Sequence, residues 1–109
     1  ETTLRKEAIE NATKYATEIP FKVMETAYSS MEVMMAMAKE GLQNSLSDAG
    51  VGALCARTAV VGAYFNVRIN AKDIKDRSFA EQILSDAKNI YDKTNLLENE
   101  MIQLIDTKI

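Results

Sequence analysis

The chain of 109 residues contains no histidine, and this absence removes several kinds of chemistry at the outset. Histidine is the commonest metal ligand and the usual general base near neutral pH. It also activates the nucleophile in Ser/His and Cys/His pairs. Acid and base chemistry in this protein would therefore fall to carboxylates or lysines.

Cysteine is nearly absent as well. The single Cys55 lies between Leu54 and Ala56 and cannot form an internal disulfide. A reducing, cytoplasmic setting fits this composition best. We expect the thiol to lie on a buried helix.

Strong net charge and long apolar runs are also missing. Thirteen Lys and Arg against sixteen Asp and Glu give a net charge of −3, which supplies no global reason to bind nucleic acid or an anionic membrane. No apolar run reaches the roughly 20 residues of a membrane span, and the longest candidate, 51–65, contains Arg57. The chain begins without a methionine or a signal pattern, so we expect a soluble chain cut from something longer.

One proline, four glycines and almost no alternation at period two favour helices over strands. Pro20 divides the first apolar pattern and predicts a kink or a restart there, and Gly41 is a natural helix stop. Further helices are expected up to about Ala71 and from about Phe79. We predict an all-α antiparallel bundle of long helices, a single unit over 1–109, with a proline-kinked first arm and a central small-residue helix. The apolar positions of the arm after Pro20 are Phe21, Met24, Tyr28, Met31, Met35, Ala38 and Leu42.

The central helix carries small residues and two amides along one stripe, because residues seven apart complete nearly two turns. With apolar residues on the opposite side, this helix should be central and buried on two sides. A buried amide without a partner costs about 1–3 kcal/mol, so Asn66 and Asn70 should bond to facing helices or turn toward a polar ligand. The stripe is Ala49, Gly52, Ala56, Ala59, Ala63, Asn66 and Asn70, and the opposite side is Val51, Leu54, Val61, Phe65 and Ile69.

Two segments, 45–48 and 78–81, match the capping-box pattern at a helix N-terminus. We expect Ser45 or Ser47 to accept from free amides of the central helix. A helix N-terminus also attracts anions, so Ser47 and Asp48 are either capping residues or part of an anion site.

Other residues also carry two interpretations. Arg57 and Arg68 either form a solvated or ion-paired edge, or one of them holds a carboxylate of a ligand or of a second subunit. Methionines at helical spacing are usually core residues rather than a promiscuous groove. We expect core or subunit-interface positions for Met24, Met31, Met34, Met35 and Met37.

Three strings in order, NSLSDAGV (44–51), GAYFNVRIN (62–70) and KDIKD (72–76), resemble the C-terminal half of the cyclodeaminase/cyclohydrolase family. The opening RKEAI (5–9) and ATEIP (16–20) are similar to the family's helix with a mid-chain proline. This family includes the cyclodeaminase domain of formiminotransferase-cyclodeaminase and the small bacterial methenyl-tetrahydrofolate cyclohydrolases. The resemblance covers nearly the whole chain.

The resemblance implies an all-helical, cytoplasmic, homo-oligomeric enzyme of folate one-carbon metabolism. The reaction would be cyclisation of formimino-tetrahydrofolate to methenyl-tetrahydrofolate with release of ammonia, or hydrolysis of the methenyl form to a formyl one. It would need no metal and no cofactor beyond the tetrahydrofolate substrate. The family motif falls on Ser47, Asp48, Asn66 and Asn70, with Arg68 as an adjunct. Asn66 and Asn70 would hydrogen-bond the pterin or position a partner, and Ser47 and Asp48 would shape the pocket mouth.

The chain departs from the family in one respect. The family domain is about twice as long as this chain, a length that a single domain can have. Its upstream half carries a glycine-rich loop and the carboxylate usually given the catalytic acid role. The catalytic residues are therefore expected upstream, and the chain alone is expected to be inactive. Its exposed core faces should be covered by the missing half or by another copy.

Two alternatives stay open. The first is a noncatalytic helical oligomerisation or interaction module, and the second is a protein that binds an acidic ligand at the cap through Ser47 and Arg68. The cap and the two asparagines are about 25–35 Å apart along the helix at 1.5 Å per residue. We favour the asparagine end as the binding site.

Overall fold

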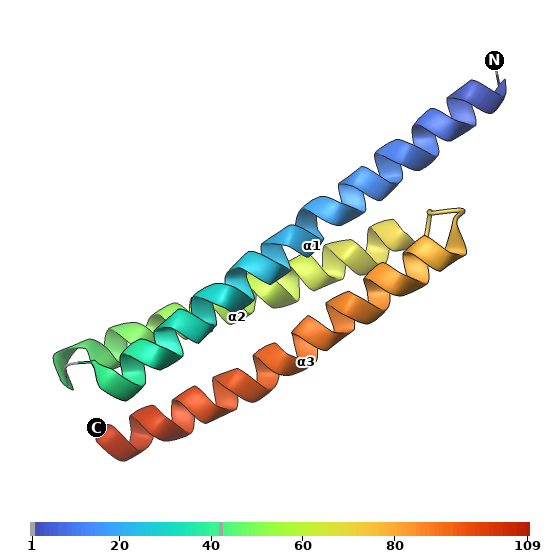
Figure 1. Cartoon of the computed structure of the whole chain (residues 1–109). Helices are drawn as coiled ribbons and strands as arrows, with labels where there is room; N and C mark the ends of the chain where they lie inside the picture. The colour runs from blue at the N-terminus through green and yellow to red at the C-terminus, as the bar shows by residue number, and fades with distance from the viewer. Residues whose placement is uncertain (1, 42) are drawn as a thin grey trace.

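Three long helices make up the part of the chain that the computed structural model describes, residues 2–41 and 43–109. Successive helices run in opposite directions and lie side by side (Figure 1). The predicted all-α antiparallel bundle is confirmed, whereas Leu42, predicted on the apolar stripe of the arm, lies outside the described residues. The elements are α1 (Thr2–Glu40), the short 3₁₀ helix η1 (Gln43–Ser45), α2 (Leu46–Ala71) and α3 (Arg77–Lys108).

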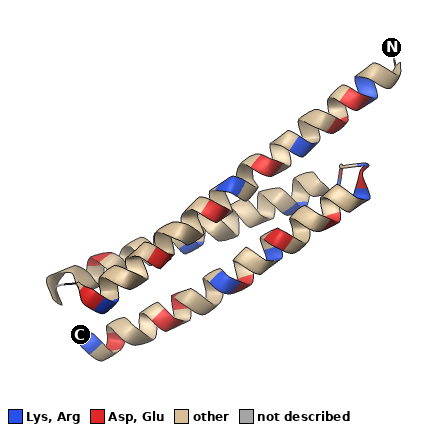
Figure 2. Cartoon of the chain, viewed as in Figure 1, with Lys and Arg blue, Asp and Glu red and all other residues tan. Residues whose placement is uncertain are grey.

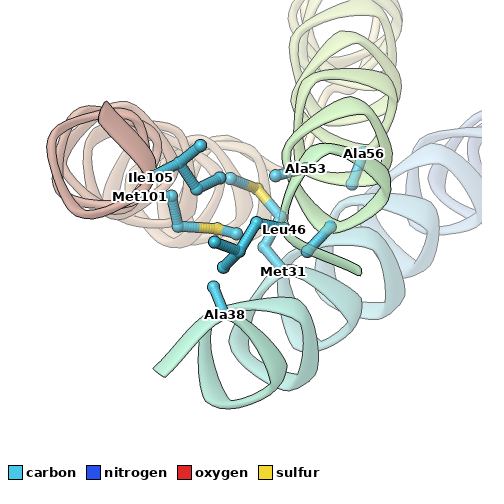
Figure 3. Close-up of a cluster of buried hydrophobic side chains, with 8 residues drawn as sticks. Met31, Ala38, Leu46, Ala53, Ala56, Met101 and Ile105 are labelled. Atoms are coloured by element: carbon cyan, nitrogen blue, oxygen red, sulfur yellow. The ribbon is translucent and has the colours of Figure 1, made fainter. Parts of the chain in front are cut away.

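Part of the core lies where the chain turns from α1 into α2. Met31 of α1 is fully buried beside Leu46 of α2 and Met101 of α3. Figure 3 shows these side chains gathered between the three helices, with Ala53 and Ala56 as the small residues of α2. Full burial of such a methionine contributes roughly 1.5–3 kcal/mol.

A second part of the core continues toward the connector between α2 and α3. Met24 and Val67 are fully buried there, together with Ala87 of α3. The core positions predicted for Met24 and Met31 are thus confirmed. Met34 and Met35 are half-buried against the first cluster, and Met37 is exposed.

Helix α1 passes through Pro20 without interruption, so the predicted restart is wrong. Proline inside a helix costs about 3 kcal/mol, in part because its missing N–H leaves the carbonyl four residues earlier without a helical donor. In α1 that carbonyl belongs to Ala16. Another element supplies a donor to this carbonyl, because Nδ2 of Asn70 on α2 donates to it at 3.0 Å.

The buried stripe of α2 is offset from the stripe that the sequence predicts. Ala59 and Asn66 are exposed, although both fall on the predicted stripe. The reason is that α1 and α3 both pack on the same side of α2 (Figure 1), so the most buried positions lie between the two contacts. They are Leu46, Ala49, Ala53, Ala56, Val60, Ala63, Val67 and Ala71.

The small residues of α2 do allow a close approach, at Gly50 and at Gly52; a Cβ added to Gly50 would lie 3.0 Å from Cδ1 of Ile105 on α3. A Cβ added to Gly52 would lie 2.9 Å from Sδ of Met34 on α1. A Cβ added to Gly62 would meet nothing within 4 Å. Packing among the described residues therefore explains the glycine at position 52 but not the glycine at position 62.

The outer face of α2, which we define by Val51, Leu54, Phe65 and Ile69, is solvent-exposed. Its four side chains are between 46% and 62% exposed. The expectation that α2 is buried on two sides is therefore wrong for this chain, because the second side has no helix against it among residues 2–41 and 43–109. Cys55 is also exposed rather than buried.

The N-terminal part of α1 projects past the bundle (Figure 1). The apolar side chains of Leu4 and Tyr15 in this part are exposed. Thr17 is the first buried residue of α1, and its hydroxyl donates to the carbonyl of Thr13 at 2.7 Å. The bundle proper therefore begins near residue 17.

Helix ends are stabilised by side chains other than those predicted. Asp76 caps α3 by accepting from the N–H of Phe79, so the capping box expected at 78–81 is wrong by two residues. The ammonium of Lys108 donates to the carbonyls of Ala38 and Lys39, which closes the C-terminal end of α1. A cation at this end of a helix is favourable because the last carbonyls have no helical donor.

Charges of both signs are spread along all three helices (Figure 2). Within the described residues, the segment Gln43–Ala71 is long and apolar enough to cross a membrane by length and composition, with 33% of the tested window buried in the bundle. A core helix of a soluble protein meets the same test, so this property is weak evidence for a membrane span. This finding limits the expectation that no segment of the chain is long and apolar enough to span a membrane.

Candidate functional site

A groove of about 390 Å³ runs between α1 and α2 and contains both candidate asparagines. We call it the amide groove. Pro20 lies on its α1 wall, and Asn66 and Asn70 lie one turn apart on its α2 wall. The other lining residues are small or aliphatic, namely Ala16, Ile19, Val23, Ala59 and Ala63.

Asn70 is half-buried and bonded across the groove. Its Nδ2 donates to the carbonyl oxygen of Ala16 at 3.0 Å. This carbonyl is the one that Pro20 leaves without a helical donor. The interpretation of Asn70 as an interhelical hydrogen-bonding residue is therefore confirmed.

Asn66 differs from Asn70 in its surroundings. It is exposed, and it has no side-chain hydrogen bond to any of the described residues. The expectation that Asn66 is buried is wrong, because the residue lines the open groove beside α1 and not the packed contact between the helices. Its amide donor and acceptor are available to a molecule in the groove.

Arg68 lies on another side of α2. Consecutive helical residues are about 100° apart, so a residue two positions from Asn66 and from Asn70 projects about 200° away from each. Its guanidinium lies 5.2 Å from the ring centre of Tyr64, which stacks on Tyr91 of α3 at 4.8 Å. The structure therefore does not bring Arg68 together with the two asparagines.

Ser47 and Asp48 are exposed in the first turn of α2. Ser45 is the N-cap residue, and its side chain makes no capping hydrogen bond, so the first predicted capping box is wrong. The preceding residues form η1, whose turn leads the chain directly into α2. Asp48 still stabilises the N-terminal end of α2, because its carboxylate interacts favourably with the positive end of the helix dipole.

The N-terminal end of α2 and the amide groove are separate places. From Asp48 to Asn66 the helix rises by about 27 Å at 1.5 Å per residue. The five candidate residues thus divide into three locations. Asn66 and Asn70 share the amide groove, Ser47 and Asp48 share the N-terminal end of α2, and Arg68 lies apart from both pairs.

A larger surface hollow of about 600 Å³ adjoins the amide groove and shares Ile19 and Val23 with it. Glu18 and Lys22 line this hollow, and neither takes part in an ion pair with any of the described residues. Neither residue was predicted from the sequence as part of a site. Their spacing of four, on either side of Pro20, is the signal that could have found them, because it places both side chains on one helix face.

The amide groove can bind but has no proton-transfer group of its own. Asparagine does not titrate, and the remaining lining residues are alanine, isoleucine, valine and proline. Carboxamides donate and accept at once, which suits a flat ring with amide-like edges between aliphatic walls. Within residues 2–41 and 43–109, no three acidic or thiol side chains gather as a possible metal site.

Comparison with known proteins connects this arrangement to one family. A sequence model of the formiminotransferase-cyclodeaminase family matches residues 1–89, which include every candidate site residue. The chain is 30% identical over 105 residues to the methenyltetrahydrofolate cyclohydrolase of Methylorubrum extorquens, covering 96% of the chain and 50% of the relative.

Longer relatives that match the chain belong to the same family. The chain is 37% identical over 75 residues to the formimidoyltransferase-cyclodeaminase of Rattus norvegicus, covering 69% of the chain and 14% of the relative. The corresponding protein of Dictyostelium discoideum is 36% identical over 83 residues, with 76% of the chain and 16% of the relative covered. The chain therefore spans about half the length of the bacterial relative and a much smaller share of the longer ones.

Proposed function

The chain belongs to the formiminotransferase-cyclodeaminase family, and from that premise we propose that it is part of a folate enzyme of one-carbon metabolism. The family match over residues 1–89 carries this proposal. The reaction is cyclisation of formimino-tetrahydrofolate to methenyl-tetrahydrofolate with release of ammonia, or hydrolysis of the methenyl form to a formyl one. We place the protein in the cytoplasm, in keeping with its single thiol.

The amide groove is our proposed contact with the pterin part of the substrate. Its two carboxamides are the only polar groups among its lining residues, and its aliphatic walls suit a flat ring. Orientation of a ring by a few polar groups in an apolar setting is typical of small-molecule sites. Ser47, Asp48 and Arg68 are then outside the pterin contact.

Proton transfer to and from nitrogen is needed in either reaction, and the amide groove supplies binding only. Among the residues that line the two adjoining depressions, the titratable side chains are Tyr15, Glu18 and Lys22. A carboxylate in hydrogen-bond reach of the reacting nitrogen would serve as general acid.

The test is conversion of formimino- and methenyl-tetrahydrofolate by the full-length protein, followed by ultraviolet absorbance of the methenyl form. We expect turnover of one of the two substrates and a marked loss in the Asn66→Ala variant. A well-folded full-length protein that turns over neither substrate would contradict the proposal.

Assembly into a homo-oligomer through helix faces is a second proposal, favoured by the exposed outer face of α2. Four large apolar side chains on one helix face exceed what scattered surface hydrophobics explain. If the protein were a noncatalytic oligomerisation module, substitutions on this face would disrupt assembly and Asn66→Ala would have no effect on folate binding. Sedimentation velocity and folate titration of the same variants distinguish the two functions.

A further inference from the structure

Pro20 and Asn70 are matched across the interface of α1 and α2. In an uninterrupted helix, the N–H of residue 20 would donate to the carbonyl of Ala16. Proline has no N–H to give. In its place, Nδ2 of Asn70 donates to the same carbonyl at 3.0 Å.

We propose that Asn70 is a positioning residue that replaces the missing backbone donor of Pro20 and fixes α1 against α2 at the amide groove, while Asn66 is the amide that meets the ligand. The identity of that ligand as a folate rests on the proposed function. The division of roles between the two asparagines rests on the hydrogen bond alone.

The different surroundings of the two side chains support this division. Asn70 is half-buried and commits one N–H to Ala16, which fixes the orientation of its amide. Asn66 lies one turn earlier in the same groove, is exposed, and keeps its whole donor and acceptor capacity among the described residues. A bound ring can therefore use Asn66 without breaking any bond of the fold.

The geometry of the groove depends on the same bond. Its α1 wall is formed by residues that flank Pro20, and its α2 wall by small residues that leave room beside α1. A second helix that donates to a carbonyl of α1 fixes both the spacing and the register of the two walls. Ligand positions tolerate little displacement, since an error of about 1 Å can cost a hundredfold in rate.

A double-mutant cycle in the full-length protein tests the positioning role. Asn70→Ala should lower the folding equilibrium constant about tenfold when Pro20 is present, because it leaves the Ala16 carbonyl without a donor. Pro20→Ala restores the backbone N–H inside α1. In the Pro20→Ala background we therefore expect Asn70→Ala to cost less than about threefold. An equal cost in both backgrounds would overturn the proposal.

An Asn70→Asp variant adds a pH readout that a cavity or a packing defect would not produce. An ionised carboxylate cannot donate to the Ala16 carbonyl, whereas a protonated one can. Stability of N70D relative to the unsubstituted protein should therefore rise as the pH falls through the range of a carboxyl group. A relative stability independent of pH would count against the donor role.

Binding separates the two asparagines. Titration calorimetry of the full-length protein with 5-formyltetrahydrofolate should show affinity about tenfold weaker for Asn66→Ala, with thermal stability unchanged. If Asn70→Ala weakened binding equally and left stability unchanged, Asn70 would be a ligand contact and the proposal would fall. If the unsubstituted protein did not bind the folate, the proposed function would fail, and the double-mutant cycle would still decide the role of Asn70.

Discussion

The carboxylate of Glu10 accepts the backbone N–H of Asp76 at 2.8 Å, and its other oxygen accepts the N–H of Lys75 at the same distance. This contact attaches the projecting part of α1 to the connector between α2 and α3. Lys14, one turn along α1, adds a 3.0 Å ion pair to the carboxylate of Asp76. The end of the bundle beside the amide groove is therefore closed by α1 itself.

These contacts predict a loss of stability in acid. The backbone N–H groups of Lys75 and then Asp76 lower the pKa of Glu10 from its ordinary 4.5, and hydrogen bonds from Lys14 and then Phe79 lower the pKa of Asp76 from 3.8. Both pKa values are lower in the folded state, so their stabilisation is present above the ordinary values and is lost as the pH falls through the lowered ones.

The measurement is chemical denaturation between about pH 6 and pH 3, the range in which carboxylates titrate. Glu10→Gln should show a smaller loss of stability over this range than the unsubstituted protein. Glu7→Gln is the control, because it removes the same charge from an exposed side chain about one turn earlier. Identical pH profiles for Glu10→Gln and the unsubstituted protein would refute the contribution of this contact.

Gly62 and Gly52 provide a matched pair for the packing of α2. Alanine is favoured over glycine inside a helix by about 1 kcal/mol, and a Cβ at Gly62 meets no atom within 4 Å. At Gly52 the same Cβ would press on Sδ of Met34 at 2.9 Å, which must move. Gly62→Ala should therefore raise the free energy of unfolding of the dilute protein by more than Gly52→Ala does, as measured by urea denaturation.

The same variant tests the proposed assembly through the outer face of α2. Gly62 lies on one helical stripe with Val51 and Ile69, because it follows Val51 by eleven positions and precedes Ile69 by seven, and both spacings are close to whole numbers of helical turns. If a second copy packs there, an added methyl group should weaken self-association in sedimentation velocity while the dilute protein gains stability. Unchanged self-association would show that Gly62 is not part of the proposed contact between copies.

Met31 and Met37 form a second matched pair on α1. Met31 is fully buried in the first core cluster, whereas Met37 is 52% exposed. Met31→Ala should lower the free energy of unfolding by about 2–5 kcal/mol through lost burial and the cavity left behind. Met37→Ala should change it by less than about 0.5 kcal/mol. Similar losses in thermal and urea denaturation would contradict the assigned core.

The helices themselves could be predicted because their signals are local. Gly41 and the charged segment 72–76 mark the breaks, and the apolar spacing around Met24 and Met31 is helical over several turns. Burial along α2 could not be predicted in the same way. Whether Asn66 or Val67 faces the core depends on which side of α2 the other helices occupy, and that is a property of the whole bundle.

The role of Asn70 was only half predictable. Its place on a helix with apolar sides indicated that its amide needs a partner, and Pro20 indicated a carbonyl that lacks a donor. Joining the two requires the register between residues 54 positions apart, Ala16 and Asn70, which no local pattern contains. The capping boxes were wrong for the opposite reason, because their local pattern was present but η1 and Asp76 begin the helices differently.

The distance between the N-terminal end of α2 and the amide groove leads to the last prediction. Ser47→Ala and Asp48→Asn should leave folate conversion by the full-length protein within about twofold, because about 27 Å of helix separates Asp48 from Asn66. Asn66→Ala should reduce it about tenfold if its hydrogen bond orients the ring, as the loss of such a bond can cost about 1.4 kcal/mol. Steady-state rates at several substrate concentrations give the comparison. A large loss in the Ser47 or Asp48 variants, with Asn66→Ala unaffected, would move the binding site to the cap.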